Sequence, residues 1–364
     1  MQVNFVHILA PGHIAGLEKV VLSGLSALKE KGEAPKCVII QDQRCPQFGE
    51  KFVDELQGLS IETSILKCYR RIDLRMFLSL RRLYQRRKWD IVHAHGYKAV
   101  IACYLAFLGT SVRIIATNHG DTGVSLNVRF FEWIQRKLFS SLDRVIAVSE
   151  KQKLEMHSTL PPSNISVIEN MLTINIPAGF ANHTEPGALK LVAVGRLSVE
   201  KGLDDLISAI STLKKGAVEL TIVGQGDLRV PLERLALKKG VSKYIKFVGF
   251  QKDIRPYIKE SHALVAPSHR EGLPLNLIEA ACYGKPIIAS QVGMNQSFVK
   301  ENGNGILVPK KNPDALASAI SQMSLNRTTF ASSASTMAPS FIRRFSKEKW
   351  ASRTMDIYRE ILNA

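Results

Sequence analysis

Short apolar segments alternate with longer amphipathic segments along almost the whole chain, and this alternation limits the fold more than any other feature. The apolar segments are rich in Val and Ile, which is typical of strands buried on both faces. A repeated order of strand, helix and strand predicts a parallel sheet with helices on both sides. We expect strands at residues 3–9, 37–40, 90–93, 113–117 and 144–148, and again at 189–194, 219–223, 245–248, 263–266 and 286–289.

The series is interrupted by residues 174–187, which are rich in Pro, Gly and Asn and show no hydrophobic period, as in a linker. With 364 residues, the chain is long enough for two domains. We therefore expect an α/β protein with two Rossmann-like doubly wound domains, residues 1–173 and 188–344, that face each other across a ligand-binding cleft. Residues 345–364 predict an amphipathic helix that packs back on the first domain.

Composition predicts a soluble protein with reduced thiols. Apolar residues make up 45% of the chain, and no uninterrupted apolar run reaches the length of a membrane span. Residues 1–10 lack the basic start and cleavage site of a signal peptide, so we expect a cytoplasmic protein. The five cysteines form no C-x-x-C pair. His93 and His95 have no third ligand nearby in the sequence, so we expect no metal.

The net charge of +17 favours a polyanionic partner. Residues 1–170 contribute +7 (23 basic, 16 acidic) and the remainder +10 (26 basic, 16 acidic), so both halves are basic. Nucleic acid, an anionic membrane surface and phosphorylated small molecules all fit this charge. No zinc finger, RNP-like aromatic motif or basic region with heptads is present, so we do not expect nucleic acid to be the partner.

Two carboxylates bracket a loop and the helix that follows it. Glu271 precedes a helix expected from about Pro274 to Tyr283, with Gly284 just beyond its end, and Glu279 lies within it. Glycosidase carboxyl pairs lie about 5 to 9.5 Å apart. Eight residues along a helix rise about 12 Å, so the two side chains point to different places. We interpret them as two contacts to one elongated ligand rather than as an acid and base pair.

Three glycine-bearing loops follow expected strands. The segment from Gly195 to Gly202 carries Arg196 and Lys201 and precedes a helix expected from about Leu203, which offers amides, a dipole and two cations to a diphosphate. A plain loop of this composition remains an alternative. Gly224 and Gly226 form a second pair, which is weak evidence because a tight turn would also explain it. Residues 12–18, with Gly16, form a third loop at a helix start, which a flexible turn would explain equally.

Taken together, the motifs resemble the retaining glycosyltransferases of family four, which have the GT-B fold. The resemblance covers about residues 3–361, and its most specific part is the Glu-x7-Glu segment with its Pro-Ser lead. The ordered set is Ala15-Gly16-Leu17-Glu18, His93-Ala94-His95-Gly96, Thr117-Asn118-His119-Gly120, Val148-Ser149-Glu150, Val194-Gly195-Arg196, Glu200-Lys201-Gly202, Val223-Gly224-Gln225-Gly226, Pro267-Ser268, Glu271-Gly272-Leu273-Pro274 and Glu279-Ala280.

This resemblance implies roles for individual residues. Arg196 and Lys201 would hold the diphosphate of a sugar nucleotide, Glu279 the ribose, and Glu271 the donor sugar. The remaining expected contacts are the Gly16 loop near the phosphates, Phe250 at the base, and Gly224, Gly272 and Leu273 elsewhere on the donor. His119 would lie at the reaction centre, with His95 either structural or on the acceptor side. We count His119, Glu271, Arg196 and Lys201 as candidate catalytic residues. No cofactor or metal is implied, because cations and amides can stabilise the leaving diphosphate.

The sequence departs from the family pattern at three places, and one of them concerns the donor sugar. The usual pair of glycines followed by Glu is replaced by Val292-Gly293-Met294-Asn295-Gln296-Ser297, so the sequence does not assign the sugar. Ala15-Gly16 replaces two glycines, a small change. The more usual Pro-Asn-Gly is also altered near Val167-Ile168-Glu169-Asn170-Met171, at the approach to the linker.

Two basic segments favour contact with a membrane. Residues 67–88 carry nine Lys or Arg against one acid, Asp73, with Ile72, Met76, Leu80 and Leu83 spaced as one helical face. Residues 129–139 place cations beside aromatic rings. A helix that covers the sheet and has an ordinary solvated basic face explains the first segment at least in part. The interpretation we favour is that the first domain docks on anionic headgroups at the inner face of the cytoplasmic membrane.

The function we expect is metal-independent transfer of a sugar, with retention, from a nucleotide-diphosphate donor, most simply a UDP-sugar. The expected acceptor is a glycan or lipid-linked molecule in bacterial lipopolysaccharide, capsule or exopolysaccharide synthesis. The alternatives are a sugar-nucleotide epimerase on the same fold, which needs no acceptor, and a sugar-nucleotide-binding protein without catalysis. Intact Arg196, Lys201, Glu271 and Glu279 argue against the second alternative.

Overall fold

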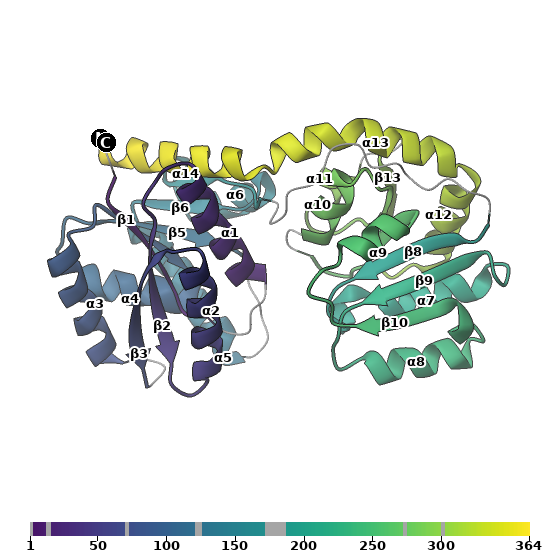
Figure 1. Cartoon of the computed structure of the whole chain (residues 1–364), viewed down its shortest axis with the longest axis horizontal. Helices are drawn as coiled ribbons and strands as arrows, with labels where there is room; N and C mark the ends of the chain where they lie inside the picture. Colours follow the sequence, from purple (N-terminus) through teal and green to yellow (C-terminus); the bar gives the residue numbers. More distant parts are fainter. Residues whose placement is uncertain are drawn as a thin grey trace. The chain divides into compact units, whose positions relative to one another are not determined.

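The chain folds into two compact units, shown in the computed structural model of Figure 1. The structure describes residues 3–11, 16–69, 73–120, 126–171, 187–271, 275–299 and 303–364. One unit comprises Met1–Thr173 with Phe345–Ala364, and the other Ile174–Arg344. Within the described ranges, no helix is both long and apolar enough to cross a bilayer. Most of the segment expected as the linker lies outside the described residues.

The first unit is built on a parallel sheet of seven strands in the order β3-β2-β1-β4-β5-β6-β7. Its strands are β1 (Phe5–Leu9), β2 (Lys36–Asp42), β3 (Glu62–Cys68), β4 (Ile91–His95), β5 (Arg113–Asn118), β6 (Arg144–Ala147) and β7 (Ile165–Val167). Its helices are α1 (Gly16–Glu30), α2 (Pro46–Gly58), α3 (Leu74–Arg87), α4 (Tyr97–Phe107), α5 (Leu126–Leu138), α6 (Glu150–Met156) and α14 (Lys347–Leu362). The sheet order changes direction at β1, which pairs with β2 on one side and β4 on the other.

Alternate residues of the strands face two separate cores. Val6 and Ile8 face a core that includes residues of α3 and α4. Phe5 and Leu9 point to the opposite face, where α1, α2 and α14 supply the apolar partners. Because successive side chains of a strand point to opposite faces, His7 of β1 and His93 and His95 of β4 share the face of Phe5.

Helix α14 completes the first unit although it lies at the other end of the sequence. Ser346 caps its start by accepting a hydrogen bond from the Lys349 amide at 3.1 Å. Its buried stripe contains Trp350, Ile357 and Tyr358, which pack in the same core as Phe5 of β1. The tail helix expected from the sequence period is thus present and covers the first unit.

The second unit contains a parallel sheet of six strands in the order β10-β9-β8-β11-β12-β13. Its strands are β8 (Leu189–Val194), β9 (Val218–Val223), β10 (Ile245–Gly249), β11 (Ala263–Ala266), β12 (Ile287–Ser290) and β13 (Gly305–Val308). Its helices are α7 (Leu203–Thr212), α8 (Arg229–Lys238), α9 (Arg255–Glu260), α10 (Leu275–Cys282), α11 (Asn295–Phe298), α12 (Pro313–Leu325) and α13 (Arg327–Arg344). Short 3-10 turns, such as Val199–Lys201, connect several of them.

The basic segment at residues 67–88 comprises the end of β3 and helix α3, and Met76, Leu80 and Leu83 pack from α3 against one core, as their helical spacing predicts. Strand β3 runs to Cys68 because residues 62–68 pair with β2. Asp73 then accepts a hydrogen bond from the Arg75 amide at 3.1 Å, and this cap sets the start of α3. Met76 and Leu80 are buried on α3, whereas Ile72 lies outside the described residues.

Candidate active site

The candidate donor-binding residues of the second unit lie at the carboxyl ends of four neighbouring strands. Phe250 follows β10, Gly224 follows β9, Arg196 and Lys201 follow β8, and Glu271 follows β11. These strands are consecutive in the sheet, so the loops after them lie along one edge. Ligands of open parallel sheets bind at this edge.

Glycines allow the loop after β8 to pack tightly against its neighbours. Gly202 has a φ of 59°, and a Cβ there would lie 2.2 Å from the carbonyl oxygen of Pro267. Gly224 has a φ of 145°, and a Cβ there would lie 1.8 Å from the carbonyl oxygen of Gly195. Since both positions combine a φ that favours glycine with a backbone in contact, any larger residue would push the loop away. The first contact brings the Lys201 turn beside the segment that carries Glu271.

Lys201 and Glu271 form an ion pair through Nζ and Oε1. Ser268 Oγ donates to the same Oε1 at 2.8 Å, so Glu271 is held by a cation and a hydroxyl. The Glu271 side chain is 10% exposed, whereas that of Lys201 keeps 25%. Together with Arg196 and Asn276, Lys201 and Ser268 line a small hollow at the end of β8. The pair places one cation and one anion beside the exposed Arg196.

Helix α10 is attached to this edge by Asn276, whose Nδ2 donates to the Val194 carbonyl at the end of β8 at 2.8 Å. Glu279 lies one turn further along α10 and is buried. The helix ends near Gly284, which has a φ of 63°, as the sequence indicates. Gly272, Leu273 and Pro274 lie outside the described residues.

In the first unit, the other candidate residues also gather at one edge of the sheet. Gly16 begins the helix after β1, His95 ends β4, and His119 follows β5. These three strands are neighbours, and the register pairs His95 with Thr117 and His7 with His93. His119 is half-buried at the edge, whereas His7, His93 and His95 are buried.

A continuous chain of hydrogen bonds links His119 to the interior. His119 Nε2 contacts His95 Nδ1 at 3.1 Å, and His95 Nε2 contacts His7 Nδ1 at 2.9 Å. His7 Nε2 then meets the Tyr358 hydroxyl of α14 at 3.1 Å, and this hydroxyl contacts His93 Nδ1 at 2.7 Å. The chain ends where His93 Nε2 meets Thr117 Oγ1 at 2.7 Å.

Burial keeps the imidazoles of this chain neutral. Desolvation lowers the pKa of His7 to about 3 and that of His119 to about 4. The pKa values of His93 and His95 also lie well below the usual value, first through desolvation and then through the neighbouring histidines. Each ring therefore carries one N–H near neutral pH.

Because each ring is neutral, the donor and acceptor roles in this series of hydrogen bonds are linked, and reversing one bond reverses the others. If Tyr358 donates to His7 and accepts from His93, each following ring must donate onward, and His119 carries its proton on Nδ1. If Tyr358 donates to His93 instead, every bond reverses and His119 Nδ1 becomes an acceptor. The tautomer at the edge of the sheet is thus coupled to a hydroxyl on the last helix.

Three of these histidines also satisfy the spacing of a metal site. One ring nitrogen from each of His7, His93 and His95 lies within 4.8 Å of the others. All six of their ring nitrogens take part in the hydrogen bonds just described. A metal ion at this place would have to break the chain, so the hydrogen-bonded chain is the arrangement that these contacts support.

Sequence reasoning missed four residues of these two sets. His7 and Tyr358 become partners of the candidate histidines only through strand register and the packing of α14. Ser268 and Asn276 stand inside the motif without an expected role, although the Ser268 hydroxyl donates to Glu271 and the Asn276 amide donates to the Val194 carbonyl.

Comparison with known proteins identifies the family. The model described as "Glycosyltransferase Family 4" matches residues 14–174, and that described as "Glycosyl transferases group 1" matches residues 179–337. The chain belongs to the group 1 glycosyltransferases. The family expected from the sequence motifs is therefore confirmed, and with it the enzyme class, a glycosyltransferase.

Individual relatives of this glycosyltransferase agree with the family. It is 35% identical over 130 residues to the uncharacterized glycosyltransferase MJ1607 of Methanocaldococcus jannaschii, covering 35% of this chain and 33% of that protein. It is 26% identical to an Escherichia coli UDP-Gal:alpha-D-GlcNAc-diphosphoundecaprenol alpha-1,3-galactosyltransferase, over 68% of this chain and 70% of that protein. The match thus spans about a third of the first relative.

Solved structures show the same architecture. Anabaena Alr3699/HepE in complex with UDP superposes with a TM-score of 0.83 at 16% identity, over 98% of this chain and 100% of that chain. At this identity the likeness concerns the fold, and it confirms the GT-B fold of this glycosyltransferase.

Proposed function

We propose that this glycosyltransferase moves a sugar, with retention and without a metal, from a UDP-sugar to a lipid-linked acceptor in the synthesis of a bacterial surface polysaccharide. The observation that carries the donor half is the set formed by Arg196, Lys201 and Glu271 at the carboxyl ends of adjacent strands. The neighbouring structure binds UDP by its description, and the Escherichia coli relative acts on a diphosphoundecaprenol-linked sugar by its name. Both names support the proposal.

In this proposal, the residues of the second unit stabilise the leaving group. Departure of the nucleoside diphosphate builds negative charge on the phosphates, which Arg196 and Lys201 oppose. Because Lys201 already pairs with Glu271, the cation is fixed before substrate arrives. Glu271 would hold sugar hydroxyls, Glu279 the ribose, and His119 would lie beside the transferred sugar. Gly224 and Phe250 would complete the nucleotide contacts.

The donor and the reaction can be tested together. We expect a UDP-sugar to raise the melting temperature more than a GDP-sugar, since mass action stabilises the form that binds it. The stabilising donor should then be consumed only when a sugar-diphosphoprenol acceptor is present, with product anomers resolved by NMR. Conversion of the nucleotide sugar without acceptor would indicate an epimerase, and stabilisation without turnover on any acceptor would indicate a binding protein. Either result would contradict the proposal.

We further propose that α3 and α5 of the first unit contact an anionic membrane. Leu74 and Leu78 on α3 are 72% and 55% exposed, and Phe130 and Trp133 on α5 are 57% and 50% exposed. The two aromatic rings stack at 6.1 Å, with Lys137 Nζ 5.9 Å from the Trp133 ring. Exposed aromatic rings beside cations are typical of surfaces that insert at the level of lipid headgroups.

Vesicle sedimentation would test this contact. Replacement of Phe130 and Trp133 by Ala should weaken binding to vesicles with anionic lipid at least tenfold, because two large apolar side chains no longer insert. Wild-type binding should also fall with added salt. Leu237→Ala serves as the control, since Leu237 is 71% exposed on α8 of the other unit. Equal binding of the double variant and this control would contradict the proposal.

A further inference from the structure

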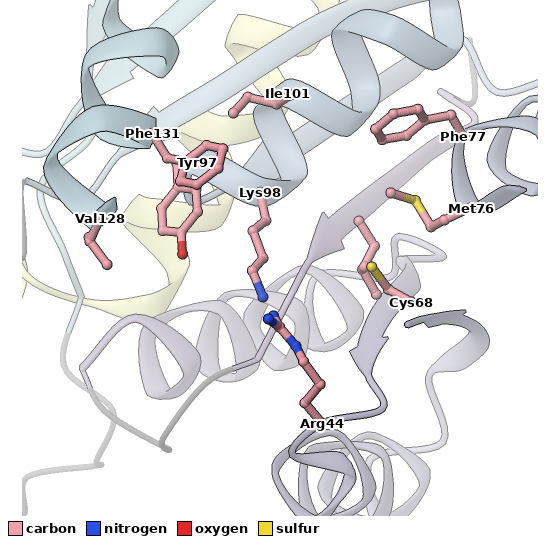
Figure 2. A pocket seen from close by; sticks show the side chains of 10 residues that line it. Arg44, Cys68, Met76, Phe77, Tyr97, Lys98, Ile101, Val128 and Phe131 are labelled. Carbon is pink, nitrogen blue, oxygen red and sulfur yellow. The ribbon is translucent and has the colours of Figure 1, made fainter. Parts of the chain in front are cut away.

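An apolar cavity lies in the first unit, apart from both the donor-binding set and the histidine chain. It has a volume of about 170 Å³ and lies between α3, α4 and α5 at the carboxyl ends of β2 and β3. Figure 2 shows its walls, with Met76 and Phe77 on one side and Val128 and Phe131 on the other. Ile40, Cys68, Tyr97 and Ile101 complete the apolar lining, and Arg44 and Lys98 are its charged members.

The lining favours a hydrocarbon over a sugar. Met76, Phe77 and Cys68 are buried, and Tyr97 stacks on Phe131 with ring centroids 5.7 Å apart. A sugar ring would need several hydrogen-bond partners, whereas most side chains that line this cavity have no hydrogen-bonding group. Methionine and aromatic side chains adapt well to a branched apolar chain.

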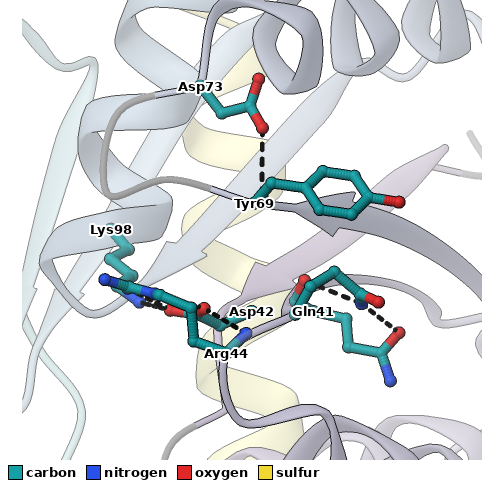
Figure 3. Close-up of polar contacts among 7 residues, drawn as sticks. Gln41, Asp42, Arg44, Tyr69, Asp73 and Lys98 are labelled. Atoms are coloured by element: carbon teal, nitrogen blue, oxygen red, sulfur yellow. Dashed lines mark hydrogen bonds and ion pairs between the residues drawn. The ribbon is translucent and has the colours of Figure 1, made fainter.

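The charged end of the cavity carries two cations for one carboxylate. Asp42 accepts from Arg44 Nε at 2.8 Å and from Lys98 Nζ at 2.8 Å. Figure 3 shows both cations converging on Asp42, and Figure 2 shows Lys98 and Arg44 extending toward each other beside the cavity. The hydrogen bond from Arg44, aided by Lys98, holds the pKa of Asp42 far below its usual range. The cluster therefore keeps a net charge of +1 near neutral pH.

We infer that this cavity holds the head-proximal isoprenoid carbons of the prenyl diphosphate part of the lipid-linked acceptor, with Lys98 and Arg44 binding its phosphates. This inference rests on the proposed function and names the lipid part of the acceptor. A cavity of about 150 Å³ accommodates benzene, so about 170 Å³ accommodates one branched five-carbon unit and little more. The rest of the chain would lie along the outer faces of α3 and α5, where Leu78 and Phe130 are exposed.

Phosphate and hydrocarbon must be recognised together for this site to select such a lipid. The cavity alone would accept any small apolar group, and the cations alone any anion. Because Asp42 already holds both cations in place, a phosphate can bind them without first ordering two long side chains. Farnesyl phosphate combines the two parts in a soluble form and is the test ligand.

Calorimetric titration of the full chain with farnesyl phosphate tests the cavity. Ile101→Trp fills the space and should weaken binding at least tenfold, because the isoprenoid unit then has no room. Leu105→Trp is the matched control, being one turn further along α4, 41% exposed and outside the lining. It should bind as the wild type does. If circular dichroism shows that Ile101→Trp does not fold, the smaller Ile101→Phe should weaken binding in the same direction.

The charged end is tested with Lys98→Gln, which should lower affinity for farnesyl phosphate about tenfold, as loss of one charge-assisted contact implies. Affinity for farnesol should be weaker than for farnesyl phosphate in the wild type and unchanged by Lys98→Gln. Inorganic phosphate alone should bind far more weakly than farnesyl phosphate. If farnesol or inorganic phosphate binds as tightly as farnesyl phosphate, the inference is overturned.

The inference and the proposed function can fail separately. If farnesyl phosphate does not bind the wild type, or if Ile101→Trp and Leu105→Trp bind it equally, the cavity assignment is wrong even when UDP-sugar transfer occurs. If no UDP-sugar is bound or transferred, the proposed function is wrong even when Ile101→Trp abolishes lipid binding. Arg196, Lys201 and Glu271, which carry the proposed donor binding, lie in the other unit, so neither cavity variant alters them.

Discussion

Replacing Lys201 by Ala should lower turnover roughly a hundredfold. The side chain supplies a fixed cation for the leaving diphosphate, and removal of one preorganised electrostatic contact costs on the order of a hundredfold in rate. The change also leaves the Glu271 carboxylate with Ser268 but without its cation. Steady-state kinetics with the donor identified by thermal shift would measure the loss.

Glu271→Ala should lower turnover by a similar factor. It removes the carboxylate that fixes Lys201 and that we propose to contact the donor sugar. Glu271→Gln separates these roles, because the amide oxygen can still accept from Ser268 while the ion pair is lost. Lys238→Ala, at an exposed lysine on α8, is the control for loss of one positive charge. Turnover near that of the wild type in both Lys201→Ala and Glu271→Ala would refute the assignment.

Acidification from pH 7 to pH 5 should lower the free energy of unfolding of the first unit by several kcal/mol. His7 has a pKa of about 3 in the folded protein and 6.5 as the ordinary value, so between these values the unfolded chain binds more protons. Stability therefore rises with pH across this window and falls on acidification, by about 2 kcal/mol for His7 alone. His93 and His95 act in the same direction, and the half-buried His119 contributes less.

Urea unfolding monitored by circular dichroism at the two pH values would measure this loss. The interval avoids most carboxylate effects, because groups such as Asp42 with a lowered pKa lose their contribution only below about pH 5. His119→Asn removes one titrating ring and should make the pH dependence shallower. Equal unfolding free energies at pH 7 and pH 5 would show that the chain is not neutral and buried as described.

The sequence predicted the central strands and the edge strand β10 well but missed the other three edge strands. Strands at Leu189–Val194 and Ala263–Ala266 match the expected bounds, because strands buried on both faces are nearly continuous apolar runs, interrupted in the first only by Lys190. The missed strands are β3, β7 and β13, and each lies at the edge of its sheet. In β3 most residues are half-buried or exposed, so its composition differs little from that of a loop.

In the candidate site, too, some residues could be predicted from the sequence and others could not. Arg196, Lys201, Glu271 and Glu279 could be proposed from the sequence because each motif follows a strand whose end must lie at the ligand-binding edge. The residues hydrogen-bonded in series with His119 could not be predicted, because they depend on the register of the strands and on the packing of α14. His7 and Tyr358 are 351 positions apart and meet through their side chains.

The place of α14 has a consequence for synthesis of the protein. On the ribosome, residues 3–171 emerge first, but the face of their sheet that bears Phe5 and Ile91 waits for Trp350 and Tyr358. At about 5–20 residues per second, the intervening stretch takes on the order of 10 to 30 s to translate. During that time the half-covered sheet is a surface on which chaperones, or other nascent chains, can act.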